Sequence, residues 1–266
     1  MLTSFRERLF GGREEPESEP KEESKETTPT KENYKSSPKE VILESRDFER
    51  EGRLLGGAVG DARFVKIMDD GGGVFKPHTG HDQKAQREYI SRERAAYLIS
   101  RFLGFDFVPP TVIKIVNGVE GSLQEFIEDA KTRAEVDYFE IDPSEKVKLA
   151  IFDILIANND RNSGNYLIKD GKIIAIDHGF SLFPDDFKNG IWDKINVIPA
   201  DIAEKLRRFI EAEEQVCILR DLLAELLGEQ IAEMFIKRLR AFVGAINDDL
   251  SFNEKKFSKS EGIIYY

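Results

Sequence analysis

Short apolar runs separated by glycine turns follow one another over residues 41–127. The runs VILESRDF, RLLGG, ARFVKIM and VFKP are rich in β-branched and aromatic residues, and the turn DDGGG separates the last two. This pattern is typical of an antiparallel sheet of meander type. Residues 84–103 instead have apolar positions at helical spacing and end before Gly104, which predicts one amphipathic helix. The runs TVIKIVNG and GSLQEFI then return to a strand pattern.

The chain after Ile127 has a mainly helical pattern. The run SEKVKLAIFDILIANND begins with a Ser144 cap and is apolar on nearly every side, which predicts a helix buried in a second lobe. Two short strands, NYLI and KIIAID, follow on either side of a Lys-Asp-Gly turn. Residues 198–246 predict two or three amphipathic helices, with Pro199 near the first start and Gly228 at a break. The whole pattern predicts an α+β fold with a β-rich N-lobe and a mainly helical C-lobe.

The N-terminal residues differ in composition from the rest. Residues 11–40 contain no Val, Ile, Leu, Met, Phe, Trp, Cys or Ala. Such a segment cannot bury enough apolar area to offset its ordering entropy, so we expect a disordered tail over residues 1–40. Residues 1–10 place four large apolar side chains near one helical face. This fits a short amphipathic helix that contacts a membrane surface or a partner protein, and it fits a frayed terminus equally well.

The changes in pattern described above divide the rest of the chain into three parts. We expect the N-lobe at residues 41–127, the C-lobe at 128–250 and a C-terminal tail at 251–266.

Composition and charge exclude several classes of function. A length of 266 residues with 40% hydrophobic content suffices for a large buried core. The net charge of -11 argues against general nucleic-acid binding, which needs a basic surface. No apolar run reaches the roughly 20 residues of a transmembrane helix, the N-terminus lacks the pattern of a secretory signal, and one cysteine excludes an internal disulfide framework. We therefore expect a cytoplasmic protein without a transmembrane segment. No His/Asp cluster has the spacing of a metallohydrolase site.

One polar segment has the spacing of a phosphoryl-transfer site. The predicted buried helix runs into NNDRNSGNYLI, which places Asp160 and Asn165 on a loop between a helix and a strand. The spacing D-x-x-x-x-N is that of the catalytic aspartate and a metal-binding asparagine in kinases, and Asp177 ends the next strand, where a second metal ligand is expected. Taken without its surroundings, this spacing is explained by an ordinary Asn/Asp/Gly turn. The strands around it, with Lys76 on an upstream strand and Glu93 on the helix after it, favour a functional site.

The glycines of GGAVGD form only part of a phosphate-binding loop. Gly56, Gly57 and Gly60 supply an incomplete G-x-G-x-x-G, and a bare glycine hairpin explains them equally well.

Several strings are similar to the catalytic domain of the phosphatidylinositol 3- and 4-kinases, especially its compact prokaryotic members. They are GVFKP, SRERAAYLISRFLGFDFVPPTVI, GSLQEFIEDA, NNDRNSGNYLI and IDHGFSLF, and they span roughly residues 50–185. The resemblance implies a two-lobed protein-kinase-like fold, ATP as the bound nucleotide and Mg²⁺, or Mn²⁺, as the metal. HipA-type toxin kinases share the same loop spacing and are the nearest competing branch.

The resemblance also implies roles for individual residues. Lys76 would bind phosphate, Glu93 would hold Lys76, Asp160 would be the catalytic aspartate, and Asn165 and Asp177 would bind the metal. The backbone of Glu125, Phe126 and Ile127 would form the strand between the lobes that pairs with adenine.

Two residues depart from the family pattern. Asn162 stands where lipid kinases often have a histidine, and His178 replaces the phenylalanine of D-F-G.

The predicted function is therefore phosphate transfer from ATP to a hydroxyl of a protein, a lipid headgroup or a small molecule. The alternative is a pseudokinase or nucleotide-sensing interaction module. Asp160 and Asp177 together favour the active kinase, because a binding module has no chemical need for both.

Overall fold

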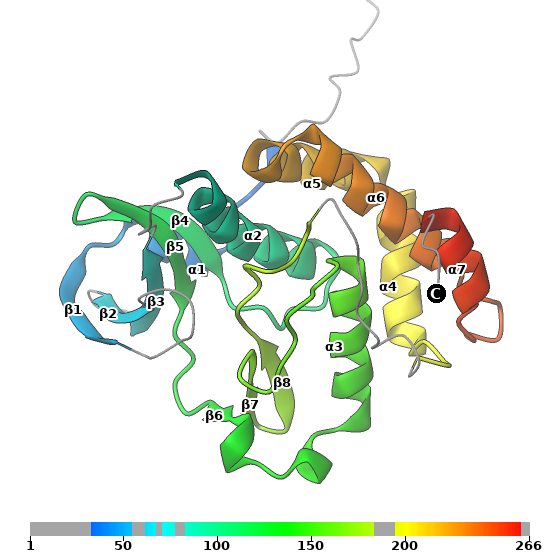
Figure 1. Cartoon of the computed structure of the whole chain (residues 1–266), viewed down its shortest axis with the longest axis horizontal. Helices are drawn as coiled ribbons and strands as arrows, with labels where there is room; N and C mark the ends of the chain where they lie inside the picture. The colour runs from blue at the N-terminus through cyan, green and yellow to red at the C-terminus, as the bar shows by residue number, and fades with distance from the viewer. Residues whose placement is uncertain (1–32, 55–61, 68–70, 78–82, 184–194, 262–266) are drawn as a thin grey trace, which may run out of the picture.

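The structure is a computed structural model and is organised as two lobes (Figure 1). It describes residues 33–54, 62–67, 71–77, 83–183 and 195–261. The predictions for residues 1–32, including the helix at 1–10, lie outside the described residues, as do those for Gly56, Gly57 and Gly60.

The N-lobe contains a five-stranded antiparallel sheet with the strand order β1-β2-β3-β5-β4. The β4–β5 hairpin folds back so that β5 lies between β3 and β4, and the register places Lys76 of β3 opposite Ser122 of β5. The strands are β1 (Phe48–Leu54), β2 (Arg63–Ile67), β3 (Gly72–Pro77), β4 (Thr111–Val116) and β5 (Val119–Glu125). This confirms the predicted β-rich first half.

One long helix, α2 (Gln83–Phe102), joins the two lobes. It contacts β4 and β5 on one side and α5 (Glu213–Leu227) on the other (Figure 1). Its buried residues, such as Leu98 and Ile99, belong to the same apolar cluster as the C-lobe core. Because both sides of α2 are packed, the position of any side chain on it is tied to both lobes.

The C-lobe combines a small sheet with helices. The sheet contains β6 (Lys131–Thr132), β7 (Tyr166–Lys169) and β8 (Lys172–Ala175). The other described helices of this lobe are α3 (Pro143–Leu155), α4 (Ala200–Glu211), α6 (Glu229–Gly244) and α7 (Glu254–Glu261), with 3-10 turns at Arg133–Glu135 and Tyr138–Glu140. The predicted Ser144 cap of α3 is wrong by two residues: the side chain of Asp142 accepts the Ser144 N–H at 2.8 Å, and Pro143 begins the helix.

Both predicted tails are too long. Helix α1 (Pro38–Ser45) begins inside the tail expected at 1–40, and its Glu40 is fully buried. At the other end, Phe257 of α7 is fully buried, and the ring centroid of Phe252 lies 4.7 Å from that of Phe242. Composition misses these segments because a few well-placed side chains anchor them.

Glu40 anchors α1 to helix α2. Its carboxylate accepts hydrogen bonds from Tyr34 at 2.6 Å and from Tyr97 at 2.9 Å, and it forms ion pairs with Arg94 and Arg101, each at 2.7 Å. Burial by itself raises the pKa of Glu40, but the hydrogen bonds from Tyr34 and from the Ser37 N–H, together with the Arg94 guanidinium, outweigh it and lower the pKa to about 2. Glu40 is therefore ionised at neutral pH.

Replacing Glu40 should destabilise the protein strongly. Glu40→Gln keeps the shape but leaves the two arginines without their carboxylate, so the free energy of unfolding should fall by about 3 kcal/mol. Glu44→Gln, on an exposed residue of the same helix, is the control and should change it by less than about 0.5 kcal/mol. Urea unfolding measures both, and an equal effect in the two variants would contradict the anchoring role.

The same group predicts a pH dependence. The folded-state pKa of Glu40 lies below the usual 4.5, so its stabilisation is present above that value and is lost as the pH falls toward 2. Between about pH 6 and about pH 3, the difference in unfolding free energy between wild type and Glu40→Gln should shrink by about 2 kcal/mol. A difference that does not vary with pH would show that Glu40 is not held as a carboxylate.

Candidate active site

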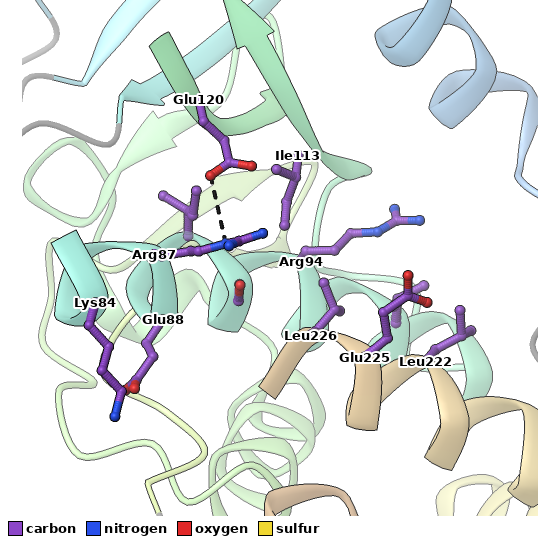
Figure 2. Close-up of a pocket in the computed structure, with 12 residues that line it drawn as sticks. Lys84, Arg87, Glu88, Arg94, Ile113, Glu120, Leu222, Glu225 and Leu226 are labelled. Atoms are coloured by element: carbon purple, nitrogen blue, oxygen red, sulfur yellow. Dashed lines mark ion pairs between the residues drawn. The ribbon is translucent and has the colours of Figure 1, made fainter. Parts of the chain in front are cut away.

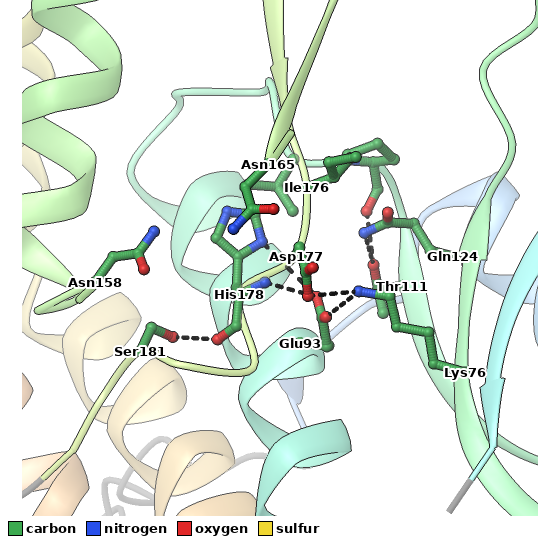
Figure 3. A network of polar contacts seen from close by, with 12 residues as sticks. Lys76, Glu93, Thr111, Gln124, Asn158, Asn165, Ile176, Asp177, His178 and Ser181 are labelled. Carbon is green, nitrogen blue, oxygen red and sulfur yellow. Dashed lines mark hydrogen bonds and ion pairs between the residues drawn. The ribbon is translucent and has the colours of Figure 1, made fainter. Parts of the chain in front are cut away.

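Three charged side chains from three different elements meet between the lobes (Figure 3). Lys76 is near the end of β3, Glu93 is on α2, and Asp177 follows β8. The Nζ atom of Lys76 lies 3.0 Å from Asp177 Oδ1 and donates a hydrogen bond to Glu93 Oε1. The structure thus brings together three of the residues singled out in the sequence.

Burial and charge fix the ionisation of the Lys76–Glu93 pair. Burial alone lowers the pKa of Lys76, but the carboxylates of Glu93 and Asp177 outweigh it and raise that pKa above its ordinary value. Burial alone raises the pKa of Glu93, and the Lys76 ammonium outweighs it, so that pKa is lowered. Both groups are charged at neutral pH, and Glu93 is only 1% exposed. Either charge left alone there would be costly.

His178 completes the surroundings of Glu93 through its backbone. Its N–H donates to Glu93 Oε2 at 3.1 Å, while its ring is fully buried edge-on against Phe152. Among the described residues, neither ring nitrogen has a hydrogen-bond partner. Burial lowers the pKa of His178, so the imidazole is neutral. The ring lies between Phe152 and the carboxylate of Glu93, whose Oε2 is 3.8 Å from the Nδ1 atom.

The backbone at Asp177 is held in an unusual conformation. Its φ of 59° lies in the left-handed region, which aspartate tolerates better than most residues. The hydroxyl of Tyr89 donates to Asp177 Oδ1 at 3.4 Å. A Cβ atom at Gly179 would lie only 2.1 Å from the Tyr89 ring, so glycine is needed for this close approach. Tyr89 thus packs closely against the segment that carries Asp177.

The D-x-x-x-x-N loop is closed by its own hydrogen bonds. The Nδ2 atom of Asn165 donates to the backbone oxygen of Asp160 at 2.6 Å and to its Oδ2 at 3.0 Å. This leaves Asn165 Oδ1 as the amide acceptor. The N–H of Ile176 donates to the Asn165 carbonyl at 3.1 Å, so Asn165 and Asp177 lie at neighbouring strand ends.

Sequence reasoning missed the residue that holds this loop in place. Arg161 forms a bidentate pair with Asp153 of α3, through Nε–Oδ2 and Nη2–Oδ1 distances of 2.9 Å each. Its Nη1 donates to the carbonyls of Ile176, at 2.9 Å, and Asn165. Arg161 therefore connects α3, the loop and the ends of both strands. The signal in the sequence was a carboxylate within the apolar second half of this helix, LAIFDIL.

The predicted adenine-binding strand is only partly available. The N–H of Glu125 donates to the Pro110 carbonyl at 2.8 Å, and the N–H of Phe126 donates to the Gly72 carbonyl at 2.9 Å. These two N–H groups are therefore already used. Within the described residues, the Ile127 N–H has no backbone acceptor and is the donor that stays consistent with the prediction.

A cavity of about 630 Å³ lies elsewhere, between α2, the β4–β5 hairpin and α5 (Figure 2). Its charges are balanced: Arg87 lies 3.8 Å from Glu120, and Arg94 forms an ion pair with Glu40. None of the predicted site residues lines it, so we do not assign the site there.

The fold and the Lys76–Glu93–Asp177 cluster are those expected of the protein-kinase-like class. Residues 116–246 match the family described as phosphatidylinositol 3- and 4-kinase. The predicted resemblance to this family is therefore confirmed over that part of the chain. Asp160, Asn165 and Asp177 lie inside the matched residues, whereas Lys76 and Glu93 lie before them.

Individual relatives that the chain resembles are named as phosphatidylinositol 4-kinases. The chain is 36% identical over 119 residues to phosphatidylinositol 4-kinase gamma 4 of Oryza sativa subsp. japonica, covering 37% of this chain and 21% of the relative. It is 30% identical over 166 residues to phosphatidylinositol 4-kinase gamma 2 of Arabidopsis thaliana, covering 50% of this chain and 29% of the relative. The chain thus spans less than a third of the length of these relatives.

One solved structure, the Helicobacter pylori proinflammatory kinase CtkA, aligns with a TM-score of 0.47 at 13% identity. The alignment covers 84% of this chain and 99% of that one.

Among the described residues, no helix is long and apolar enough to cross a bilayer.

The contact between Gly179 and Tyr89 can be tested by substitution. Gly179→Ala should lower the free energy of unfolding by about 1–3 kcal/mol, because the new methyl group overlaps the Tyr89 ring. Gly244→Ala, where a Cβ meets nothing within 4 Å, is the control and should not lower the free energy of unfolding, because alanine favours the helix more than glycine does. Tyr89→Ala added to Gly179→Ala should cost less than the sum of the two single changes in urea unfolding. Additive costs would show that the two residues do not meet.

Proposed function

We propose that the chain is a kinase that transfers the terminal phosphate of ATP, bound with Mg²⁺, to a hydroxyl group. The observation that supports this most directly is the meeting of Lys76, Glu93 and Asp177 from three separate elements. Phosphoryl transfer requires positioned charges and little covalent chemistry from the protein, which is what such a cluster provides.

Lys76 would bind the nucleotide phosphates. Its ammonium is held by Glu93 and Asp177 at a fixed point between the lobes. A phosphate oxygen that approached this point would meet a cation whose position is already set, so little reorganisation would be needed on binding. Glu93 would not touch the nucleotide and would act by positioning Lys76.

The oxygens at the strand ends suit a hard divalent cation. Asn165 presents Oδ1, since its Nδ2 is used by Asp160, and Asp177 presents a carboxylate. Mg²⁺ is commonly held by one or two protein oxygens together with substrate phosphates and water. The described residues contain no group of three or more His, Cys, Asp or Glu side chains that could hold a metal alone, which agrees with a site completed by phosphates. When bound, the metal would neutralise charge on the phosphates.

Asp160 would orient the acceptor hydroxyl and accept its proton. Its two carboxylate oxygens accept from Asn162 at 3.2 Å and from Asn165 at 3.0 Å, so the carboxylate is held within the loop. Arg161, fixed to Asp153 behind the loop, would position Asp160 without contacting the reacting groups.

For the acceptor, we propose the inositol headgroup of phosphatidylinositol. The proposal is supported by the matched relatives, whose names describe phosphatidylinositol 4-kinases. A hydroxyl of a protein is the alternative acceptor.

Two conservative substitutions test the roles of the aspartates. Asp177→Asn removes one charge from the metal ligands, so nucleotide binding should require much more Mg²⁺ and turnover should fall by roughly a thousandfold or more. Asp160→Asn leaves the metal ligands whole, so ATP with Mg²⁺ should bind with near-normal affinity while transfer slows.

Calorimetric titration of ATP at several Mg²⁺ concentrations, with turnover assays on phosphatidylinositol vesicles and on protein extract, distinguishes the outcomes. Equal loss of Mg²⁺-dependent binding in both variants would contradict the assigned roles. Nucleotide binding by the wild-type chain without any transfer would favour the pseudokinase.

A further inference from the structure

Two side chains donate hydrogen bonds to the same oxygen of Asp177. The Nζ atom of Lys76 donates to Oδ1 at 3.0 Å, and the hydroxyl of Tyr89 donates to Oδ1 at 3.4 Å. Within the described part of the chain, no residue donates to Oδ2, and the Asp177 side chain is 38% exposed. The carboxylate therefore has one oxygen that the protein holds and one oxygen that is left for a ligand.

The ring of Tyr89 is held by the segment that carries Asp177. It meets the ring of Phe180 edge-on, with the two centroids 5.2 Å apart, and a Cβ atom at Gly179 would lie only 2.1 Å from it. Tyr89 is on α2, which both lobes pack against. Its hydroxyl is therefore carried on a ring with little freedom to move, whereas the ammonium group of Lys76 ends a flexible four-carbon chain.

The donors to Oδ1 determine how the Asp177 carboxylate is turned. The outer torsion of an aspartate side chain is broad and roughly two-fold, so rotation about it exchanges the two oxygens. In the proposed kinase the ammonium group of Lys76 would bind the nucleotide phosphates, and its contact with Oδ1 would weaken. Among the described residues, Tyr89 is then the donor that still holds Oδ1.

The length of the Tyr89 bond agrees with this role. Hydrogen bonds between two oxygens usually measure about 2.5–3.0 Å, so 3.4 Å is long. In this arrangement Oδ1 also accepts from Lys76 at 3.0 Å. Hydrogen bonds in active sites are often long without the ligand and shorten once it is bound. A move of Lys76 toward phosphate would leave Oδ1 to the Tyr89 hydroxyl.

We propose that Tyr89 is a positioning residue, whose hydroxyl holds Oδ1 of Asp177 so that Oδ2 stays available to the metal when Lys76 turns to the nucleotide. Tyr89 would touch neither the nucleotide nor the metal. The inference rests on the proposed function, because that function assigns Asp177 to the metal.

The test begins with Tyr89→Phe in the full chain. This substitution keeps the ring against Gly179 and Phe180 and removes only the hydroxyl. Calorimetric titration with ATP at several Mg²⁺ concentrations gives the Mg²⁺ concentration at which ATP affinity is half-maximal. That concentration should rise by about fivefold, as expected for the loss of one hydrogen bond of ordinary strength.

Tyr97→Phe is the matched control for a general loosening of α2. Tyr97 is on the same helix, and its hydroxyl donates to the carboxylate of Glu40 at 2.9 Å, outside the candidate active site. The control should lower the urea concentration at the midpoint of unfolding, because it removes a buried hydrogen bond. It should change the Mg²⁺ requirement by less than about twofold.

Urea unfolding without nucleotide or metal tests the contact itself. Tyr89→Phe and Asp177→Ala together should lower the unfolding midpoint by less than the sum of the two single changes, because each removes the same hydrogen bond. Additive changes, or a Mg²⁺ requirement that Tyr89→Phe leaves as in the wild type, would overturn the inference while the proposed function stands. A wild-type chain that does not bind ATP with Mg²⁺ would instead refute the proposed function, and the inference with it.

Discussion

The placement of Lys76 between two carboxylates is the constraint on which the rest of the site depends. Each carboxylate comes from a different element, so the ammonium group fixes β3, α2 and the segment after β8 relative to one another. Glu93 is almost fully buried, and a buried carboxylate without its cation would cost several kcal/mol. The arrangement of the lobes around the site is therefore set by charge pairing as well as by apolar packing.

Helix α2 carries a second buried charge cluster that has no part in the site. Glu40 binds Arg94 and Arg101 on this helix, while Glu93 on the same helix binds Lys76. Arg94 directly follows Glu93, so a shift of α2 that broke one cluster would strain the other. The N-terminal helix α1 thus contributes to the geometry of the site from a distance, through the helix that both clusters share.

The sequence predicted the parts of the site that depend on spacing within a loop or at the end of an element. Asp160 and Asn165 are such a case, because a buried helix and a strand fix both ends of their loop. Contacts between elements that neither spacing nor the family resemblance implies could not be predicted, and the pair between Arg161 and Asp153 is one. Likewise, the N–H of Phe126 donates a hydrogen bond to the carbonyl of Gly72 only because β3 pairs with β5 in this register. The role of Glu40 was missed because its charged segment has no periodic pattern of apolar residues, although this one carboxylate anchors helix α1.

The conformation of Asp177 links stability to function within the site. A left-handed φ at a residue other than glycine costs about 1 kcal/mol, and the bonds from Lys76 and Tyr89 offset this only when the cluster is assembled. Lys76 in turn is held in place by Glu93, whose second oxygen accepts the N–H of His178, the residue after Asp177. The contacts therefore form a closed cycle through β3, α2 and the segment after β8. Because each member positions the next, the energies of these contacts belong to the cycle as a whole and cannot be divided among its residues.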